Sequence, residues 1–196
     1  MVDLLVADLD WLTPQVAVGG DLHPDPELAA AQARWLEEHG VTDILDCREE
    51  HSDAELVAQA APSLRYHHLP VDDHGGRMPA HWWRRGVQLA GRAIEQGGSV
   101  FVHCHMGINR GPSMALAILI DQGWEPIEAW RLLRARRPYA FAVYGTQYLL
   151  LVGRDDDAQA LADVIDEECD RTDRIATIGR IRRAEGGTGY RFPLAM

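Results

Sequence analysis

Residues 100–113, VFVHCHMGINRGPS, decide the fold and the chemistry that we expect of this chain. The run 100–102 is β-branched and aromatic and follows a glycine pair, so it predicts a short buried strand. From residue 112 onward the chain is apolar on almost every side, which is typical of a core helix that begins at a proline. Cys104 therefore ends a strand, and Arg110 follows after a five-residue loop, directly before a helix.

A loop in this position is suited to binding an anion. The N-terminus of the following helix offers unpaired N–H groups and the positive end of the helix dipole. Gly107 lets the backbone curl so that successive N–H groups point inward, and Arg110 adds a planar fork for two oxygens. The loop residues expected to surround the anion are His105, Met106, Gly107, Ile108 and Asn109.

The same field would act on the cysteine thiol. A thiol beside a helix N-terminus and an arginine has a pKa below that of a free thiol, so we expect Cys104 to be a reactive thiolate. His103 precedes it and is expected to orient the loop through its ring N–H groups. A lone cysteine on an apolar strand is more often a buried hydrophobe, and His103-Cys104-His105 also suggests metal ligands. The other candidate ligands have no paired spacing, so we expect no metal.

With these residues in view, the chain resembles the cysteine-dependent protein phosphatases with a Cys-x5-Arg loop, and most closely their dual-specificity branch. The resemblance extends from about Thr13 to Val152. It implies an α/β fold with a central, largely parallel sheet flanked by helices. It also implies hydrolysis of phosphomonoesters through a phosphocysteine intermediate, with Cys104 as nucleophile, Arg110 as phosphate ligand and no cofactor.

In this family an aspartic acid about thirty residues before the cysteine protonates the leaving oxygen. The segment 66–76 has the same pattern of strand, proline, apolar residue and acid in a glycine-ended loop. Alignment on Pro70 selects Asp73 as the general acid, and Asp72 is the second choice. The alternative is that both carboxylates are ordinary turn residues.

One position departs from the family pattern. A Ser or Thr usually follows the arginine, and its hydroxyl helps the thiolate leave when the intermediate is hydrolysed. This chain has Gly111 there, whereas Ser113 occupies another common hydroxyl position. We therefore expect the second step of turnover to be slow.

Cys47 ends another expected strand, and it resembles the second cysteine that some lipid and cell-cycle phosphatases carry. Such a thiol forms a disulfide with the nucleophile and protects it from overoxidation. A buried structural cysteine is the alternative interpretation.

Composition limits the partners. The chain has 196 residues, a net charge of −11 and 19 basic residues that are all arginine. The negative charge disfavours nucleic acid or an anionic membrane as partner, and no apolar run is long enough to span a bilayer. The N-terminus lacks a signal pattern, and three cysteines without framework spacing fit a reducing cytoplasm. The arginine bias suggests a GC-rich bacterial source.

The remaining pattern alternates strands and helices, which predicts one α/β domain. Strands are expected at 16–20, 41–46 and 64–71, besides the cysteine strand, and helices at 27–38, 79–95, 126–136 and 144–152. We divide the chain into a catalytic domain at 13–152 and a segment at 153–196. That segment begins with an acidic amphipathic helix expected to pack on the core and ends in a partly mobile tail.

The expected substrate is a phosphorylated protein or peptide. The loop holds no lysine or second arginine, which favours a single phosphate over a polyphosphorylated inositide. We expect this phosphate to be that of phosphotyrosine, although these residues do not distinguish it from phosphoserine or phosphothreonine. Four arginines after the core helix form either a basic rim for acidic phosphopeptides or an ordinary solvated helix face: Arg131, Arg134, Arg136 and Arg137. Three alternatives stay open, namely a non-catalytic phosphate reader, an RNA 5′-triphosphatase and a rhodanese-like sulfurtransferase. The last usually has a loop shorter by one residue. The oligomeric state is left open.

Overall fold

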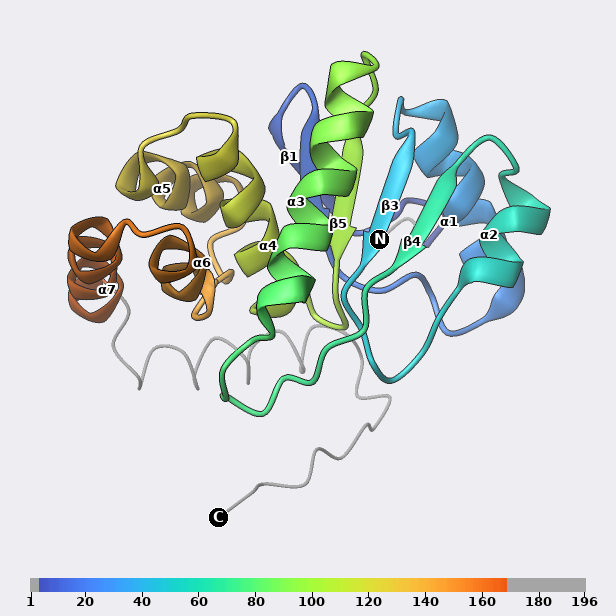
Figure 1. The fold of residues 1–196 in the computed structure, drawn as a ribbon. Helices are drawn as coiled ribbons and strands as arrows, with labels where there is room; N and C mark the ends of the chain where they lie inside the picture. Colours follow the sequence, from blue (N-terminus) through green and yellow to red (C-terminus); the bar gives the residue numbers. More distant parts are fainter. Residues whose placement is uncertain (1–3, 169–196) are drawn as a thin grey trace.

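The structure, a computed structural model, describes residues 4–168 (Figure 1). The expected C-terminal tail, including Cys169, lies outside the described residues. Five strands form one sheet in the order β1-β2-β5-β3-β4. Their bounds are Leu9–Thr13 for β1, Val16–Gly19 for β2, Asp43–Asp46 for β3, Arg65–His68 for β4 and Val100–His103 for β5. Only β1 pairs antiparallel, with β2, so the prediction of a largely parallel sheet is confirmed.

Seven helices cover the sheet within the described part of the chain. They are α1 (Pro26–Glu38), α2 (Ala54–Ala60), α3 (Ala80–Glu95), α4 (Arg110–Asp121), α5 (Pro126–Arg136), α6 (Gly145–Leu151) and α7 (Asp155–Glu168). Figure 1 shows α5, α6 and α7 gathered on the far side of α3 and α4 from α1 and α2. The chain is thus a sheet between two helical layers of unequal size.

Alternation along the strands builds the two layers. Val100 and Val102 of β5 belong to the core beneath α3 and α4, whereas Phe101 between them belongs to the smaller core beneath α1 and α2. Side chains of a strand point to opposite faces in turn, so both faces of a central strand must be apolar. β5 is buried at every position, with its neighbours β2 and β3 on either side.

The helix after the cysteine loop is the centre of the larger layer. From Arg110 to Ile120 every residue of α4 is buried. A helix enclosed on all sides has little freedom to shift, because close-packed neighbours oppose any movement. The loop between β5 and α4 is therefore held at both ends by rigid elements.

The structure adds two elements that the sequence did not predict. β1 was missed because only Leu12 of its five residues is buried, which leaves little alternation to read. α2 was missed because it has only seven residues, of which Val57 alone is buried. The acidic helix α7 packs its apolar side on the larger core through Leu161 and Ile165. Among residues 4–168, no helix is long and apolar enough to cross a membrane.

Candidate active site

The expected nucleophile lies in the loop that joins β5 to α4. The Cys104 side chain is 2% exposed, and its sulfur accepts hydrogen bonds from the backbone N–H groups of Gly111 and Ile108. These N–H groups belong to the first turn of the helix and to the loop before it, as expected for an anion-binding loop. The position of the thiol thus follows directly from the strand–loop–helix order of the sequence.

The electrostatic expectation for this thiol was wrong. Burial raises the pKa of Cys104, whereas the charge of Arg110 and the two loop N–H groups lower it and Asp73 raises it. Burial prevails, so the pKa lies above that of an ordinary thiol. Arg110 itself is paired with the Glu50 carboxylate, which opposes part of its charge.

Arg110 is fixed by this carboxylate. Its Nη1 and Nη2 each donate to Glu50 at 2.8 Å, and Nη1 also donates to the carbonyl oxygen of Val71 at 3.0 Å. Although burial acts to lower its pKa, the Glu50 carboxylate keeps the guanidinium charged. Its buried Nε–H has no acceptor among the described residues. One edge of the guanidinium is therefore hydrogen-bonded to Glu50 and Val71, while its Nε edge has no hydrogen-bond partner within residues 4–168.

The side chain of Asp73 lies beside Arg110, whereas that of Asp72 does not. The Oδ2 atom of Asp73 lies 3.7 Å from Nε of Arg110, and its Oδ1 accepts a hydrogen bond from the Tyr144 hydroxyl at 2.6 Å. Asp72 points away: its side chain is 60% exposed and pairs with His74, which is 68% exposed. The hydroxyl of Tyr144 also accepts the Gly75 N–H at 3.1 Å, which ties the acid loop to the start of α6.

The loop backbone depends on glycine at one point. Gly107 has φ +60°, and a Cβ atom there would lie 2.3 Å from Nη2 of Arg137 and 2.6 Å from the carbonyl oxygen of Gly19. A side chain would be excluded both by conformation and by space. The curled loop that the sequence predicts around Gly107 is present.

Arg137 supports that loop from behind. It is fully buried, its Nε donates to the Gly107 carbonyl at 2.8 Å, and its Nη2 donates to the Met106 carbonyl at 3.3 Å. Its charge is met by Asp8 at 2.6 Å and by Asp10 at 2.7 Å. The interpretation of this residue as part of an exposed basic rim was wrong, because the chain folds it under the loop.

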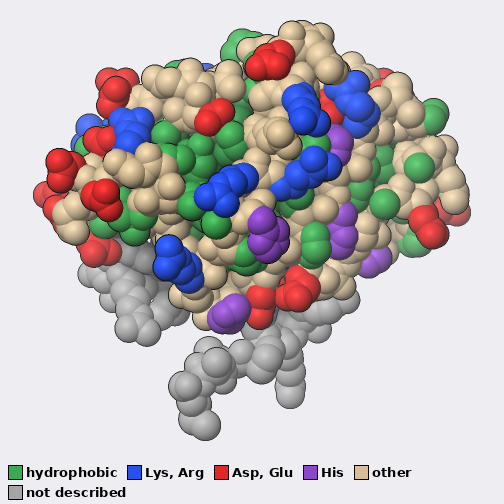
Figure 2. Space-filling model, in the orientation of Figure 1, with side chains coloured by type: hydrophobic (Ala, Val, Ile, Leu, Met, Phe, Trp, Pro, Cys, Tyr) green, Lys and Arg blue, Asp and Glu red, His purple; other side chains and the backbone are tan. Residues whose placement is uncertain are grey.

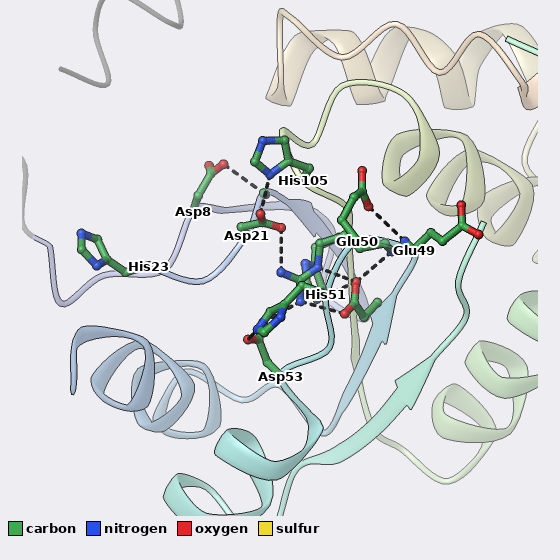
Figure 3. Close-up of polar contacts among 12 residues, drawn as sticks. Asp8, Asp21, His23, Glu49, Glu50, His51, Asp53 and His105 are labelled. Carbon is green, nitrogen blue, oxygen red and sulfur yellow. Dashed lines mark hydrogen bonds and ion pairs between the residues drawn. The ribbon is translucent and has the colours of Figure 1, made fainter. Parts of the chain in front are cut away.

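A second ion-pair network lies beside the loop (Figure 3). His105 Nδ1 and Asp21 Oδ2 are 2.5 Å apart, and this carboxylate raises the pKa of the imidazole. The other Asp21 oxygen lies 3.1 Å from Arg48, which also binds Asp46 at 2.7 Å and Asp53 at 2.6 Å. The network connects the loop to the ends of β2 and β3 and to the start of α2.

Asp46 is the buried centre of this network. Burial acts to raise its pKa, but His103 and Arg48 lower it, and the result is a pKa of about 2. Burial also lowers the pKa of His103, so Arg48 supplies the permanent positive charge beside Asp46. His103 Nε2 is 3.7 Å from Asp46, and its buried Nδ1 has no partner within residues 4–168. The sequence predicted that the ring N–H groups of His103 would orient the loop, but Nδ1 makes no such hydrogen bond.

Cys47 lies next to this strand end. It is fully buried, and its backbone N–H donates to the carbonyl of His103 at 2.9 Å. Burial raises the pKa of its thiol, and Cys104 raises it further. Both cysteines are free thiols in neighbouring chain segments.

Gly111 and Ser113 show how tightly α4 packs on β5. A Cβ atom at Gly111 would lie 2.9 Å from the carbonyl carbon of His103 and 3.0 Å from the backbone nitrogen of Cys104. A serine would therefore need a backbone shift. Ser113 is buried, and its Oγ accepts the Tyr144 N–H at 3.2 Å, so it also supports the start of α6.

The remaining loop residues are held less uniformly. The Ile108 carbonyl accepts N–H groups from Phe141 at 2.8 Å and Ala142 at 3.2 Å. Asn109 precedes α4, and its buried Oδ1 has no hydrogen-bond partner in the described part of the chain. Met106 is partly buried against the larger core. Across residues 4–168, no three His, Cys, Asp or Glu side chains gather as metal ligands would.

Three side chains of the site were missed by sequence reasoning: Glu50, Asp21 and Tyr144. Only Glu50 had a signal, since it follows a strand end that was already noted for Cys47. The partners of the other two are distant in sequence: 84 residues separate Asp21 from His105, and 71 separate Tyr144 from Asp73.

A buried cysteine, a clamped arginine and a nearby carboxylic acid at the end of a parallel strand define the class of cysteine-dependent phosphatases. The family model described as "Dual specificity phosphatase, catalytic domain" matches residues 27–147. The chain belongs to this family and carries a cysteine-dependent phosphatase catalytic domain.

Individual phosphatases and phosphatase-like structures are also similar to this chain. Human "Dual specificity protein phosphatase 5" is 27% identical over 124 residues, which is 62% of this chain and 31% of that protein. The chain thus spans about a third of that relative's length. The crystal structure of PTPMT1 in complex with PI(5)P has a TM-score of 0.61 at 19% identity and covers 80% of this chain and 97% of that one. Human "tyrosine phosphatase-like serine/threonine/tyrosine-interacting protein" has a TM-score of 0.58 at 18% identity, with coverages of 74% and 97%. These two show the likeness of the fold.

Proposed function

We propose that this protein is a phosphomonoester hydrolase that dephosphorylates phosphotyrosine, and also phosphoserine or phosphothreonine, in proteins. The observation that carries the proposal is the convergence of Asp73, Arg110 and Cys104 at one end of β5, with Asp73 3.7 Å from the arginine. A nucleophile, an anion ligand and a proton donor are the three groups that phosphoryl transfer to sulfur requires.

The proposed reaction has two steps. The Cys104 thiolate attacks phosphorus, the bond to the ester oxygen breaks, and Asp73 gives its proton to that oxygen. Asp73 then takes a proton from water, whose oxygen attacks phosphorus, and the sulfur–phosphorus bond breaks to release phosphate and the thiolate. Arg110, through its Nε edge, and the loop N–H groups hold the phosphoryl oxygens in both steps. The scheme uses no metal or organic cofactor.

Because burial raises the pKa of Cys104, the thiol must first lose its proton to solvent or base. The thiolate is the nucleophile, so the first step requires an ionised Cys104 together with a protonated Asp73. The supporting groups are His103, which anchors the strand end, and Ser113, which anchors the start of α6 beside Tyr144.

The substrate class rests on the composition of the loop. Neither lysine nor a second arginine stands between Cys104 and Arg110, so the loop supplies charge for a single phosphate. A phosphoinositide, such as the PI(5)P bound by one structural neighbour, and an RNA 5′-triphosphate are the alternative substrates. Retention of activity after Asp73→Ala would favour the RNA substrate. The cytoplasmic location and the bacterial source are proposals from composition alone.

A non-catalytic phosphate reader is the second candidate function. Two observations favour it: the raised pKa of the Cys104 thiol and the lack of space for a hydroxyl-bearing side chain at Gly111. It predicts binding of a phosphopeptide without hydrolysis.

The test is hydrolysis of para-nitrophenyl phosphate between about pH 5 and pH 9, a range that includes ordinary thiol titration. Wild type is compared with Cys104→Ser, Asp73→Ala and Asp72→Ala. We expect no turnover by Cys104→Ser and about 10²–10⁴-fold slower turnover by Asp73→Ala. Asp72→Ala, the matched control, should stay close to wild type. Absence of turnover by the reduced wild type would contradict the proposed hydrolase activity and favour the non-catalytic phosphate reader.

A further inference from the structure

A groove of about 470 Å³ lies on the outer face of the molecule between α3 and α6. Its apolar lining includes Val87 of α3, Tyr148 and Leu151 of α6, and Val152 directly after α6. Val152 is 47% exposed, Val87 and Leu151 are half-buried, and Tyr148 is buried. An apolar groove that solvent reaches is a common feature of protein interaction sites.

Arginines dominate the α3 side of this groove. Arg84 and Arg92 line it, and Arg77 and Arg85 lie near the beginning of the same helix. Figure 2 shows the arginine side chains along the middle of this face, where Figure 1 places α3. Within residues 4–168, none of these four forms an ion pair with an Asp or Glu. Their charge is therefore not neutralised by a neighbouring carboxylate of the described residues, in a chain with 30 acidic residues and a net charge of −11.

The acidic residues of the groove lie at its other end. Glu95 is the last residue of α3 and Asp121 the last of α4, and Asp121 accepts a hydrogen bond from Tyr148 at 3.0 Å. Toward the start of α3 the groove carries the positive charge of Arg84, whereas toward its end Arg92 lies beside Glu95 and the net charge with Asp121 is negative. Its polarity gives a bound segment a preferred direction.

The basic end of the groove is continuous with the active site. α3 follows the loop that carries Asp73, and α6 begins after Tyr144, whose hydroxyl binds that acid. Gln147 of α6 accepts the Met78 N–H at 2.8 Å and donates to the Gly76 carbonyl at 3.2 Å, so the two helices are joined at this loop. A chain that leaves the active site on this side would reach the basic end of the groove first.

We infer that this face docks the protein substrate through a segment that combines acidic residues with an apolar anchor. The inference rests on the proposed function and extends it by naming a recognition element outside the catalytic loop. The acidic residues would pair with the arginines of α3, and the anchor would cover Val87 and Leu151. The protein's own residues 169–196 have the wrong charge for this role, since they contain six arginines and only three acidic residues.

The test uses two phosphotyrosine peptides with the same core. One continues into a segment of Asp, Glu and Leu, and in the other the acids are replaced by Asn and Gln. Wild type should show a lower KM for the acidic peptide. Arg84→Glu/Arg92→Glu should raise that KM about three- to tenfold, as expected for the loss of exposed ion pairs, and leave kcat and para-nitrophenyl phosphate hydrolysis unchanged. About 0.5 M salt should remove the preference.

Arg34→Glu is the matched control, because it makes the same change of charge at an exposed position of α1. It should leave the KM of both peptides unchanged. Equal KM values for the two peptides with wild type would overturn the inference, as would a dimer that wild type forms and Arg84→Glu abolishes. Fluorescence anisotropy with the unphosphorylated acidic peptide measures docking without turnover. Binding that Arg84→Glu weakens would support the docking face even if no phosphate is released and the proposed function fails.

Discussion

Arg137→Lys tests whether the loop is supported from behind by a buried guanidinium. Lysine keeps one positive charge but cannot bond two carbonyl groups and two carboxylates at once. The buried Gly107 carbonyl, now bonded at 2.8 Å, would lose its partner, at a cost of about 1–3 kcal/mol. The bonds to Asp8 and Asp10 contribute less, about 0.5–1 kcal/mol, because those side chains are 49% and 34% exposed.

The expected loss of unfolding free energy is therefore about 2–4 kcal/mol. For a chain of this size that corresponds to a fall in Tm of roughly 5–15 °C. Because the loop that positions Cys104 would also relax, kcat/KM for para-nitrophenyl phosphate should fall about tenfold or more. Thermal unfolding and steady-state kinetics measure the two effects.

The control is Arg136→Lys, one residue earlier and exposed. It should change neither quantity. If Arg137→Lys behaved like Arg136→Lys in both assays, the loop would not depend on this side chain, and the reasoning would be refuted.

Four further predictions concern the thiol, the buried acid and turnover. Asp46, with a pKa of about 2 against an ordinary 3.8, contributes about 2 kcal/mol of stability that is present above pH 4 and is lost as the pH falls toward 2. The difference in unfolding free energy between wild type and Asp46→Asn should therefore shrink over that range. A difference that stays constant would contradict this prediction. The rate of Cys104 alkylation by iodoacetamide should rise with pH into the alkaline range. Glu50→Gln should move this pH profile to lower pH, because it leaves the Arg110 charge unopposed. An unchanged pH profile would show that Glu50 positions Arg110 without affecting the Cys104 pKa. Peroxide should link Cys47 to Cys104 as a disulfide, which peptide mass spectrometry of wild type and Cys47→Ser would reveal or exclude. With Gly111 beside the nucleophile, product should appear in a burst followed by a slower steady state, and linear turnover from the first cycle would contradict the slow second step. Gly111→Ser should lower the free energy of unfolding by about 1–3 kcal/mol, because its Cβ atom has no space.

Local sequence was sufficient for the strand, the loop and the core helix. Residues 100–113 contain a buried strand, a glycine that adopts φ +60° and an apolar helix, and each of these depends on neighbours in the chain. The position of Asp73 also followed from sequence, because a proline and a glycine-ended loop mark it. The weakly patterned β1 and the short α2 were missed, since periodicity needs several buried positions to be recognised.

The environment of these groups was decided only by tertiary structure. The sequence determined the local position of the three residues proposed to carry the chemistry: a cysteine after a strand, an arginine before a helix and an acid in a loop. It did not determine that Glu50 would neutralise Arg110, that Tyr144 would hold Asp73, or that Arg137 would be buried under the loop. Those contacts join residues 30 to 71 positions apart, and burial and charge at a site are sums over such distant neighbours. The direction in which the pKa of Cys104 departs from its ordinary value is therefore a property of the fold, while the proposal of Cys104 as nucleophile follows from the sequence.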